Sequence, residues 1–290
     1  MKLSNLDVNM DDMNINKVSI SGENSIFNGM TSDMGLPTGF EKLDYLIKGL
    51  KKSSLYIIAS RPGLGKTTLA LNIATFVAYQ NIPVEIFSLE ISKERLLKNL
   101  IASTALVDIG KINTGSLSEE DISKIKESRK VIENKEIYID DTPKISIEEI
   151  RKKSRKLKLE KNIGLIVIDY LQLIDKTSDN EQGRAEIITN LKILAKELNI
   201  PILVVSQLKS KVEQREGRKI YLTDLNKCIV QYADVIMLMN MDEEDEHVRK
   251  ITIAKNTYGG IGEIKLLFIT KWFKYTNLER RRDKFDKYWI

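Results

Sequence analysis

A glycine-rich turn between an apolar run and a helical segment constrains this chain more than any other feature. In "LYIIASRPGLGKTTLALNIA", Gly63 and Gly65 follow a strand-like run and precede a segment with helical character. A strand, turn and helix in this order lets backbone N–H groups close around phosphate oxygens, in front of the positive end of the helix. Lys66 can reach the β- and γ-phosphates, and the Thr67 hydroxyl can bind Mg²⁺. We therefore predict a P-loop that binds ATP and Mg²⁺.

One position departs from the usual P-loop pattern, because Ser60 stands where the first glycine normally lies. Gly63 supplies flexibility to the turn instead. The alternative is a fortuitous glycine turn, which the strand and helix on either side disfavour. The predicted nucleotide-binding residues are Ser60, Arg61, Pro62, Gly63, Leu64, Gly65, Lys66, Thr67 and Thr68.

Strand-like and helical runs alternate along most of the chain, and the strands are apolar on both faces. This pattern predicts an α/β fold with a mostly parallel sheet that helices cover on both sides. Two further strands, near 250–254 and 263–268, flank "KNTYGGIG" and predict a β-hairpin appended to the sheet edge. The expected helices span 66–79, 93–107, 119–133, 147–157 and 185–198, with a further helical pattern within 35–50.

Composition excludes several classes of protein. The single cysteine, Cys228, rules out an internal disulfide framework, and the single histidine, His247, disfavours a histidine-based metal site or a Ser-His-Asp triad. No apolar run reaches membrane-spanning length, and the N-terminus lacks the apolar core of a signal peptide. We expect a cytoplasmic protein with no membrane partner. A net charge of +5 is compatible with contact with nucleic acid but does not by itself indicate it.

Three regions are expected. Residues 1–34 are polar and weakly periodic, which predicts an arm or linker. Residues 35–277 form the predicted ATPase domain. Residues 278–290 are a basic and aromatic tail, which either binds single strands by stacking or, more in keeping with such tails, packs on its own domain or a neighbour.

Three predicted strands end in polar residues that could serve a nucleotide site. Asp169 ends "IGLIVID", where a carboxylate could help to hold Mg²⁺. Glu90 follows "EIFSL" and could polarise the attacking water, or it could simply start the next helix. Gln207 ends "ILVVSQ" and could sense the γ-phosphate, although a turn with solvated charges fits the pattern as well. The charged run that follows could contact a nucleic-acid backbone through Lys209, Lys211 and Arg215.

Taken together, these stretches resemble the C-terminal motor domain of DnaB-type replicative helicases, within the RecA-like ATPases. The resemblance extends from about Gly35 to Asn277 and rests on the order of "GLPTGFEKLD", "SRPGLGKTTLALNIA", "FSLEIS", "LIVIDYLQL" and "VVSQLKSKVEQREGRK". It implies a RecA-like core that assembles into a ring, usually a hexamer, with ATP between subunits and single-stranded DNA in the centre.

The resemblance also implies roles for single residues. Lys66 and Thr67 would bind phosphate and Mg²⁺, and Asp169 would support Mg²⁺. Glu90 would be the general base, and Gln207 would be the γ-phosphate sensor. Lys255 matches a lysine of the family's hairpin and is a further candidate catalytic residue.

The sequence departs from the family in three places. Thr257 stands where the family carries an arginine that reaches the neighbour's γ-phosphate. The family's DNA-contacting loop is altered to "TDLNKCI", where Asn226 and Lys227 are the candidate DNA contacts. The family also has an N-terminal helical domain that forms a collar and recruits primase, and we do not expect the polar residues 1–34 to form such a domain.

Two functions remain open at this stage. The first is an ATP-dependent helicase core that translocates on single-stranded DNA, with primase or a loader as a further partner. The second is a degenerate ATP-binding module that regulates, loads or inhibits a related replicative helicase. Thr257 and the altered DNA-contacting loop favour this second function. A third option, a RecA-like recombinase or sensor ATPase, fits the fold but not "VEQREGRK".

Overall fold

The computed structural model describes residues 34–175, 181–208 and 219–278, and the statements below concern these residues. The predicted N-terminal arm, most of the C-terminal tail, and Lys209, Lys211 and Arg215 lie outside them. The described helices are α2 (Glu41–Ile47), α3 (Lys66–Tyr79), α4 (Lys93–Ala105), α5 (Ile109–Thr114), α6 (Glu119–Glu133), α7 (Ile147–Lys161), α8 (Glu181–Leu198) and α9 (Lys227–Tyr232). The strands are β1 (Leu55–Ser60), β2 (Val84–Ser88), β3 (Ile137–Asp140), β4 (Leu165–Asp169), β5 (Ile202–Gln207), β6 (Val235–Met241), β7 (Val248–Asn256), β8 (Gly262–Ile269) and β9 (Lys274–Asn277).

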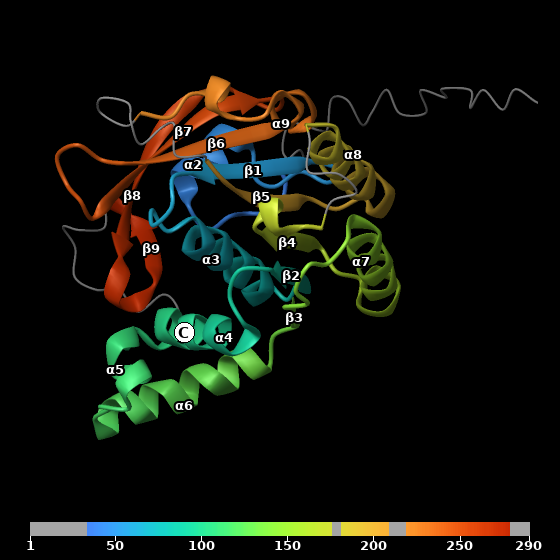
Figure 1. The fold of residues 1–290 in the computed structure, drawn as a ribbon. Coiled ribbons are helices and arrows are strands. Elements are labelled where there is room, and N and C mark those ends of the chain that lie inside the picture. Colours follow the sequence, from blue (N-terminus) through green and yellow to red (C-terminus); the bar gives the residue numbers. More distant parts are fainter. Residues whose placement is uncertain (1–33, 176–180, 209–218, 279–290) are drawn as a thin grey trace, which may run out of the picture. The chain divides into compact units, whose positions relative to one another are not determined.

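All of these strands belong to one sheet, in the order β3-β2-β4-β5-β1-β6-β7-β8-β9 (Figure 1). The first six strands in this order run parallel, and β7, β8 and β9 continue the sheet by antiparallel pairing. The α/β prediction and the predicted hairpin at the sheet edge are therefore confirmed. The sequence analysis missed β9, α5 and α9.

The sheet separates two hydrophobic cores, and β1 shows why the parallel strands lack an apolar–polar alternation. Tyr56 and Ile58 face one core, together with residues of α2, α3 and α4. Leu55, Ile57 and Ala59 face the other core, together with residues of α7, α8 and α9. Because both faces are covered, each position of a central strand is buried, and the strand becomes a continuous apolar run.

Local signals explain several helix ends. Ser118 and Ser146 form capping boxes with Asp121 and Glu149 at the starts of α6 and α7. α3 and α6 have the predicted bounds, whereas α7 continues four residues beyond the predicted end at 157 and α8 begins four residues before the predicted start at 185. The predicted helical pattern in 35–50 is limited to the seven residues of α2.

Candidate functional site

The P-loop joins β1 to α3. β1 ends at Ser60, α3 begins at Lys66, and both Gly63 (φ +75°) and Gly65 (φ +90°) have left-handed backbone conformations. A side chain at Gly63 would meet open space, so conformation alone requires glycine there. A Cβ atom at Gly65 would lie 2.6 Å from the Tyr275 hydroxyl, so Gly65 is also required by close packing.

Lys66 is a buried cation in this loop, with an exposed fraction of 8%. Its Nζ donates a hydrogen bond of 2.9 Å to the carbonyl oxygen of Arg61, across the loop. Burial lowers the pKa of Lys66 to about 8, against the opposing effect of the Asp169 and Glu90 carboxylates. The side chain therefore lies where a phosphate cradle needs a positive charge.

Asp169 ends β4 and is 3% exposed. Neither of its carboxylate oxygens has a hydrogen-bond partner of standard geometry among the described residues, although the Thr67 hydroxyl is near enough to lower the pKa of Asp169. Burial raises the pKa of Asp169 to about 6, and the charge of Glu90 adds to the rise. A buried carboxylate with free oxygens beside a threonine hydroxyl fits a hard cation such as Mg²⁺.

Glu90 lies two residues beyond the end of β2 and is exposed. It does not start a helix, because α4 begins at Lys93 and its N-cap is Ser92. Ser88 is in register with Asp169, so β2 and β4 end side by side. Glu90 consequently contributes to the pKa values of both Lys66 and Asp169.

Gln207 ends β5, next to β1, with Ser60 in register beside it. Gln172, three residues after Asp169, donates from Nε2 to the Gln207 carbonyl oxygen (2.9 Å) and to Ser206 Oγ (3.0 Å). Its Oε1 accepts from the Gln207 N–H (3.1 Å). Gln172 thus links the segment after Asp169 to the predicted sensor. Sequence reasoning missed this residue, whose only signal was a polar side chain within the apolar "YLQLI".

The candidate residues separate into two groups at opposite edges of the parallel sheet. The P-loop, Asp169, Glu90 and Gln207 follow the carboxyl ends of β1, β4, β2 and β5. Lys255 pairs with Ile236, which pairs with Ile57, the third of the six residues of β1. Thr257 lies at the amino end of β1, because its N–H bonds to the Asp234 carbonyl oxygen and the Asp234 N–H bonds to the Leu55 carbonyl oxygen. Since a strand rises about 3.3 Å per residue, Thr257 lies roughly 17 Å back along β1 from its carboxyl end, and Lys255 roughly 10 Å.

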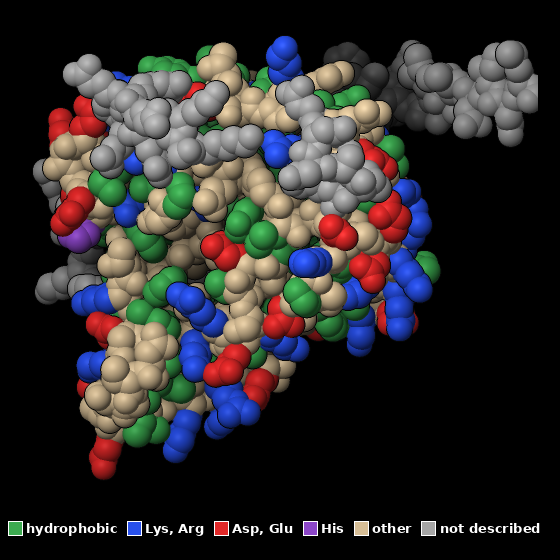
Figure 2. All heavy atoms as spheres, in the orientation of Figure 1, with side chains coloured by type: hydrophobic (Ala, Val, Ile, Leu, Met, Phe, Trp, Pro, Cys, Tyr) green, Lys and Arg blue, Asp and Glu red, His purple; other side chains and the backbone are tan. Residues whose placement is uncertain are grey.

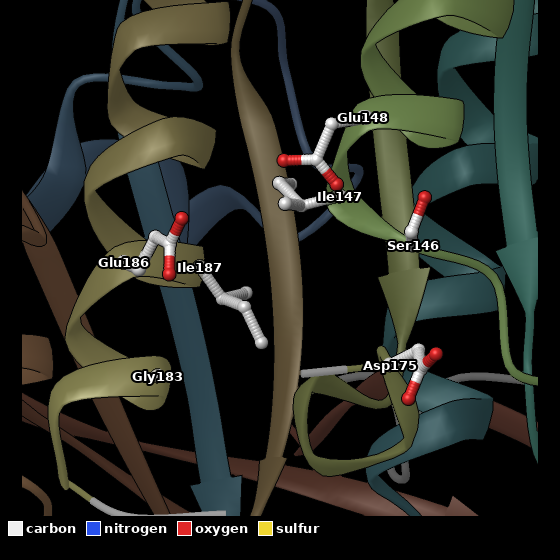
Figure 3. Close-up of a pocket in the computed structure, with 7 residues that line it drawn as sticks. All are labelled: Ser146, Ile147, Glu148, Asp175, Gly183, Glu186 and Ile187. Carbon is white, nitrogen blue, oxygen red and sulfur yellow. The ribbon is translucent and has the colours of Figure 1, made fainter. Parts of the chain in front are cut away.

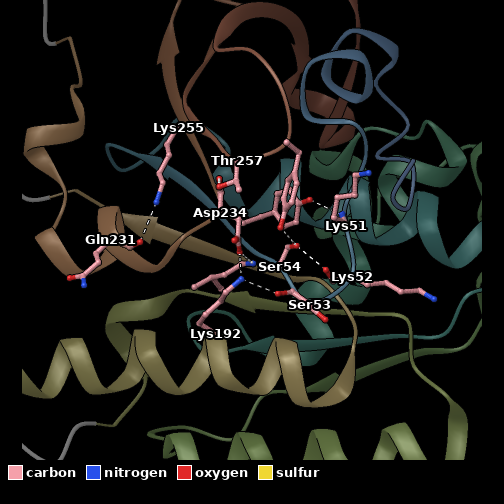
Figure 4. A network of polar contacts seen from close by, with 12 residues as sticks. Lys51, Lys52, Ser53, Ser54, Lys192, Gln231, Asp234, Lys255 and Thr257 are labelled. Carbon is pink, nitrogen blue, oxygen red and sulfur yellow. Dashed lines mark hydrogen bonds and ion pairs between the residues drawn. The ribbon is translucent and has the colours of Figure 1, made fainter. Parts of the chain in front are cut away.

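Lys255 and Thr257 are both bonded within their own chain (Figure 4). Lys255 Nζ donates to the carbonyl oxygens of Val230 (2.8 Å) and Gln231 (3.2 Å) in α9. The backbone N–H and the hydroxyl of Thr257 each donate to the Asp234 carbonyl oxygen over 3.0 Å. The Thr257 position is exposed, as a residue that acts on another subunit would have to be.

The Asp234 carboxylate anchors this region to the rest of the sheet. Its Oδ2 accepts from Lys192 Nζ (2.6 Å) and from the Leu55 N–H (2.7 Å). The Asp234 and Lys192 side chains are only 14% and 16% exposed. The start of β1 and the hairpin are therefore held by one polar network.

The altered loop 223–229 leads into α9. Asn226 is the N-cap of α9, and its side-chain oxygen accepts from the Cys228 N–H over 2.8 Å. Lys227 is exposed, whereas Ile229 is 4% exposed and belongs to the core. Asn226 therefore has a clear structural role, and Lys227 is the candidate contact that points to solvent.

A small cavity of about 150 Å³ lies elsewhere, between the N-terminal parts of α7 and α8 (Figure 3). Ile147 and Ile187 line it, with Glu148, Asp175 and Glu186 around them. Both isoleucines belong to the core opposite α3. None of the predicted site residues lines this cavity.

The surface of α7 carries many lysine and arginine side chains, which are visible at the right of Figure 2, where Figure 1 labels α7. Several are paired: Lys153 Nζ lies 2.6 Å from Asp140 Oδ2, and Arg155 contacts Glu197 through two nitrogens. The basic character of α7 is thus partly neutralised and does not by itself indicate a nucleic-acid surface.

In the described part of the chain, no helix is long and apolar enough to cross a membrane, and no cluster of three or more His, Cys, Asp or Glu side chains could hold a metal ion.

Comparison with known proteins places these observations in a family. A model of the DnaB-like helicase C terminal domain matches residues 35–277. The replicative DNA helicase DnaB of Geobacillus stearothermophilus is 40% identical over 263 residues, which are 86% of this chain and 58% of that protein. The replicative DNA helicase DnaC of Bacillus subtilis is 40% identical over 262 residues, with the same coverage. The chain thus spans somewhat more than half the length of these relatives.

Solved structures agree with this comparison. One of them, an ATPase domain, superposes with a TM-score of 0.83 at 30% identity, over 88% of this chain and 95% of that domain. A DnaB-like replicative helicase, solved in a study of its interactions with primase, gives the same TM-score and identity over 64% of its chain. The RecA-like expectation for the fold is confirmed.

Proposed function

The chain belongs to the family of DnaB-like helicase C-terminal domains, and on this premise we propose that it is the ATP-driven motor of a replicative DNA helicase. It binds ATP and Mg²⁺ at the P-loop and moves on single-stranded DNA within a ring of identical subunits, with a hexamer as the expected size. Primase or a helicase loader is the expected further partner, and the cytoplasm is the expected location.

The residues at the carboxyl edge have distinct roles in this proposal. Backbone N–H groups of the P-loop and the Lys66 ammonium bind the phosphates. Thr67 and Asp169 would hold Mg²⁺, which would neutralise charge on the phosphates. Glu90, which is exposed and next to Asp169, accepts a proton from the attacking water. Gln207 reports the presence of the γ-phosphate through its bonded partner Gln172.

The position of the hairpin is the observation that supports the proposed assembly into a ring. Thr257 lies at the amino edge of the parallel strands, whereas the P-loop lies at the carboxyl edge. Lys255 is level with the middle of β1, and its side chain is bonded to α9, away from the P-loop. The two residues cannot act on the P-loop of their own chain, so a role in ATP turnover requires a neighbouring subunit. DNA contacts by Lys227, and by the charged run that includes Lys209, Lys211 and Arg215, belong to the same proposal.

A second function is favoured by one specific observation. Thr257 cannot supply the positive charge of an arginine finger, and its hydroxyl is bonded to the Asp234 carbonyl oxygen. A subunit of this kind would bind ATP and regulate, load or inhibit a related replicative helicase. The intact P-loop, Asp169 and Glu90 weigh against a complete loss of turnover.

The ATPase rate with and without single-stranded DNA, together with the mass of the protein bound to a non-hydrolysable ATP analogue, separates the two functions. DNA-stimulated turnover by a ring of subunits is the expected result and would exclude the regulator. A monomer that binds ATP without turning it over would exclude the helicase motor.

A further inference from the structure

The carbonyl oxygen of Leu64, in the middle of the P-loop, accepts hydrogen bonds from two buried side chains on distant strands. Arg249 of β7 donates from Nε over 3.1 Å, and Tyr275 of β9 donates from its hydroxyl over 2.9 Å. Arg249 is 4% exposed and Tyr275 is 3% exposed. These donors lie 185 and 211 residues after Leu64 in the sequence.

The geometry of the peptide bond gives these contacts a consequence for phosphate binding. The carbonyl of Leu64 and the N–H of Gly65 belong to one planar trans unit, so they point in opposite directions. Donors that fix the carbonyl therefore also fix the direction of the Gly65 N–H. A charged donor further polarises the peptide unit and strengthens its N–H as a donor.

The two donors are themselves tightly held. The Tyr275 ring stacks on Phe268, with centroids 4.6 Å apart and planes 10° from parallel, and the Arg249 guanidinium lies 5.2 Å from the Phe268 centroid. Asn72 of α3 accepts from the Tyr275 N–H (2.7 Å) and donates to the Phe273 carbonyl oxygen (3.2 Å). β9 is thus bonded both to the P-loop and to the helix that follows it, and Figure 1 shows β9 beside α3.

The charge of Arg249 is not balanced by an ion pair with any carboxylate of the described residues. Its Nη1 donates to the carbonyl oxygens of Glu246 and Val248 instead. A buried positive charge directly behind the loop favours the binding of an anion in front of it, since a low-dielectric surrounding screens it weakly.

We propose that Arg249 and Tyr275 are positioning residues for nucleotide binding, which hold the Leu64–Gly65 peptide so that the Gly65 N–H faces the phosphates. This proposal rests on the proposed function of the P-loop as the ATP site. It extends the site to β7 and β9, which the usual P-loop residues do not include.

The test uses the full chain with Tyr275→Phe and Arg249→Met, and measures Mg·ADP and Mg·ATP affinity with a fluorescent nucleotide analogue. Tyr275→Phe keeps the ring stacked on Phe268 and removes only the hydroxyl donor, so we expect roughly 3- to 10-fold weaker binding. Arg249→Met removes a charged donor, and we expect roughly 10- to 100-fold weaker binding. In turnover assays KM should rise with little change in kcat, because the contact acts on bound phosphate before the chemical step.

Matched controls are Tyr79→Phe, which removes a tyrosine hydroxyl bonded to Thr104, and Arg155→Met, which removes an arginine from the surface of α7. Both should bind nucleotide like the parent. A purely structural role for Tyr275 would lower the melting temperature and leave affinity unchanged, and that result would overturn the proposal. Should Arg249→Met fail to fold, Tyr275→Phe still decides the question.

Lys66→Ala separates this proposal from the one on which it rests. Loss of nucleotide binding in Lys66→Ala, with parental affinity in both Tyr275→Phe and Arg249→Met, would overturn the positioning role alone. Parental affinity in Lys66→Ala would overturn the P-loop assignment itself.

Discussion

The main-chain N–H of Leu89 donates a hydrogen bond of 2.7 Å to the carbonyl oxygen of Asp169. This bond joins the ends of β2 and β4, so the residue after Leu89 is held near the buried carboxylate. Glu90 is that residue, and its exposed carboxylate lies next to the proposed Mg²⁺ ligand rather than inside α4. An exposed carboxylate at this position could accept a proton from a water molecule within hydrogen-bond reach, as the role proposed for Glu90 requires.

Glu90→Gln should therefore separate ATP binding from ATP turnover. We expect nucleotide affinity within about threefold of the parent, and a kcat reduced by roughly 10²- to 10⁴-fold, since only the proton acceptor is lost. A fluorescent nucleotide titration and a phosphate-release assay measure the two quantities. Glu94→Gln, an exposed carboxylate in the first turn of α4, is the control. Parental kcat in Glu90→Gln would exclude this residue as the base.

Nucleotide affinity should fall as the pH rises above about 8. Burial lowers the pKa of Lys66 to about 8, so the free protein loses this charge as the pH rises through that value. The phosphates bind the charged form, which limits the loss to about tenfold per pH unit. A titration series from pH 6.5 to 9.5 measures the effect, with Lys66→Ala as the reference. The same pH dependence in Lys66→Ala would assign it to another group.

Asp169→Asn should change how stability depends on pH. Because burial raises the pKa of Asp169 to about 6, ionisation costs folding free energy as the pH rises from about 4 to above 6. The experiment compares the free energies of unfolding of the variant and the parent in buffer with EDTA and without nucleotide. The value for the variant minus the value for the parent should increase by on the order of 2 kcal/mol between pH 4 and pH 7.5. Urea unfolding at both pH values measures this difference.

Asp140→Asn is the matched control for that experiment, with the opposite sign. Although burial alone would raise the pKa of Asp140, hydrogen bonds from Lys153 and Thr142 hold it below its ordinary value. The Asp140 carboxylate therefore stabilises the fold once it is ionised. The free energy of unfolding of Asp140→Asn minus that of the parent should decrease as the pH rises. An identical pH profile for the two variants would contradict the burial of an uncompensated charge at Asp169.

Thr257→Arg tests the missing positive charge at the neighbouring site. In an assembled ring we expect the ATPase rate to rise by at least about tenfold. An arginine finger of optimal geometry raises kcat by a factor of roughly 10³ to 10⁵. Thr252→Arg adds the same charge to β7 five residues earlier and should leave the rate near that of the parent. An unchanged rate for Thr257→Arg in a ring confirmed by mass measurement would reject the idea that Thr257 limits turnover.

Gln172→Leu tests the link between the segment after Asp169 and the end of β5. The variant removes the three hydrogen bonds that Gln172 makes to Ser206 and Gln207, while the size of the side chain changes little. We expect ATP to bind with nearly parental affinity and DNA stimulation of turnover to be lost. Gln231→Leu, in α9, is the control. Normal DNA stimulation in Gln172→Leu would show that the sensor acts through other contacts.

Much of the site was predictable because it depends on local sequence. The P-loop needs a strand, a turn with glycine and a helix in direct succession, and the structure has these elements at 55–60, 61–65 and 66–79. Asp169 and Gln207 were found because each ends an apolar run. For Glu90, the sequence left open whether it starts a helix. The start of α4 at Lys93, capped by Ser92, decided that question.

The contacts between distant segments could not be predicted in this way. Hydrophobic periodicity identifies a strand but does not determine which strand lies beside it, because pairing depends on how the faces of the whole sheet pack. The strand order therefore could not be derived from any single stretch, and neither could the location of Thr257 at the amino edge of β1. Gln172 was missed for the same reason, since its partners belong to a different strand.

The sequence alone determined that this chain has an α/β fold with a glycine-rich loop between a strand and a helix, because strands, turns and helices of this kind depend on neighbouring residues. Only the tertiary structure decided what surrounds that loop. Arg249 and Tyr275 contact Leu64 from β7 and β9, and Lys255 of β7 contacts α9. These contacts exist because one continuous sheet brings together strands that are far apart in the sequence, and the burial of both its faces determines their register.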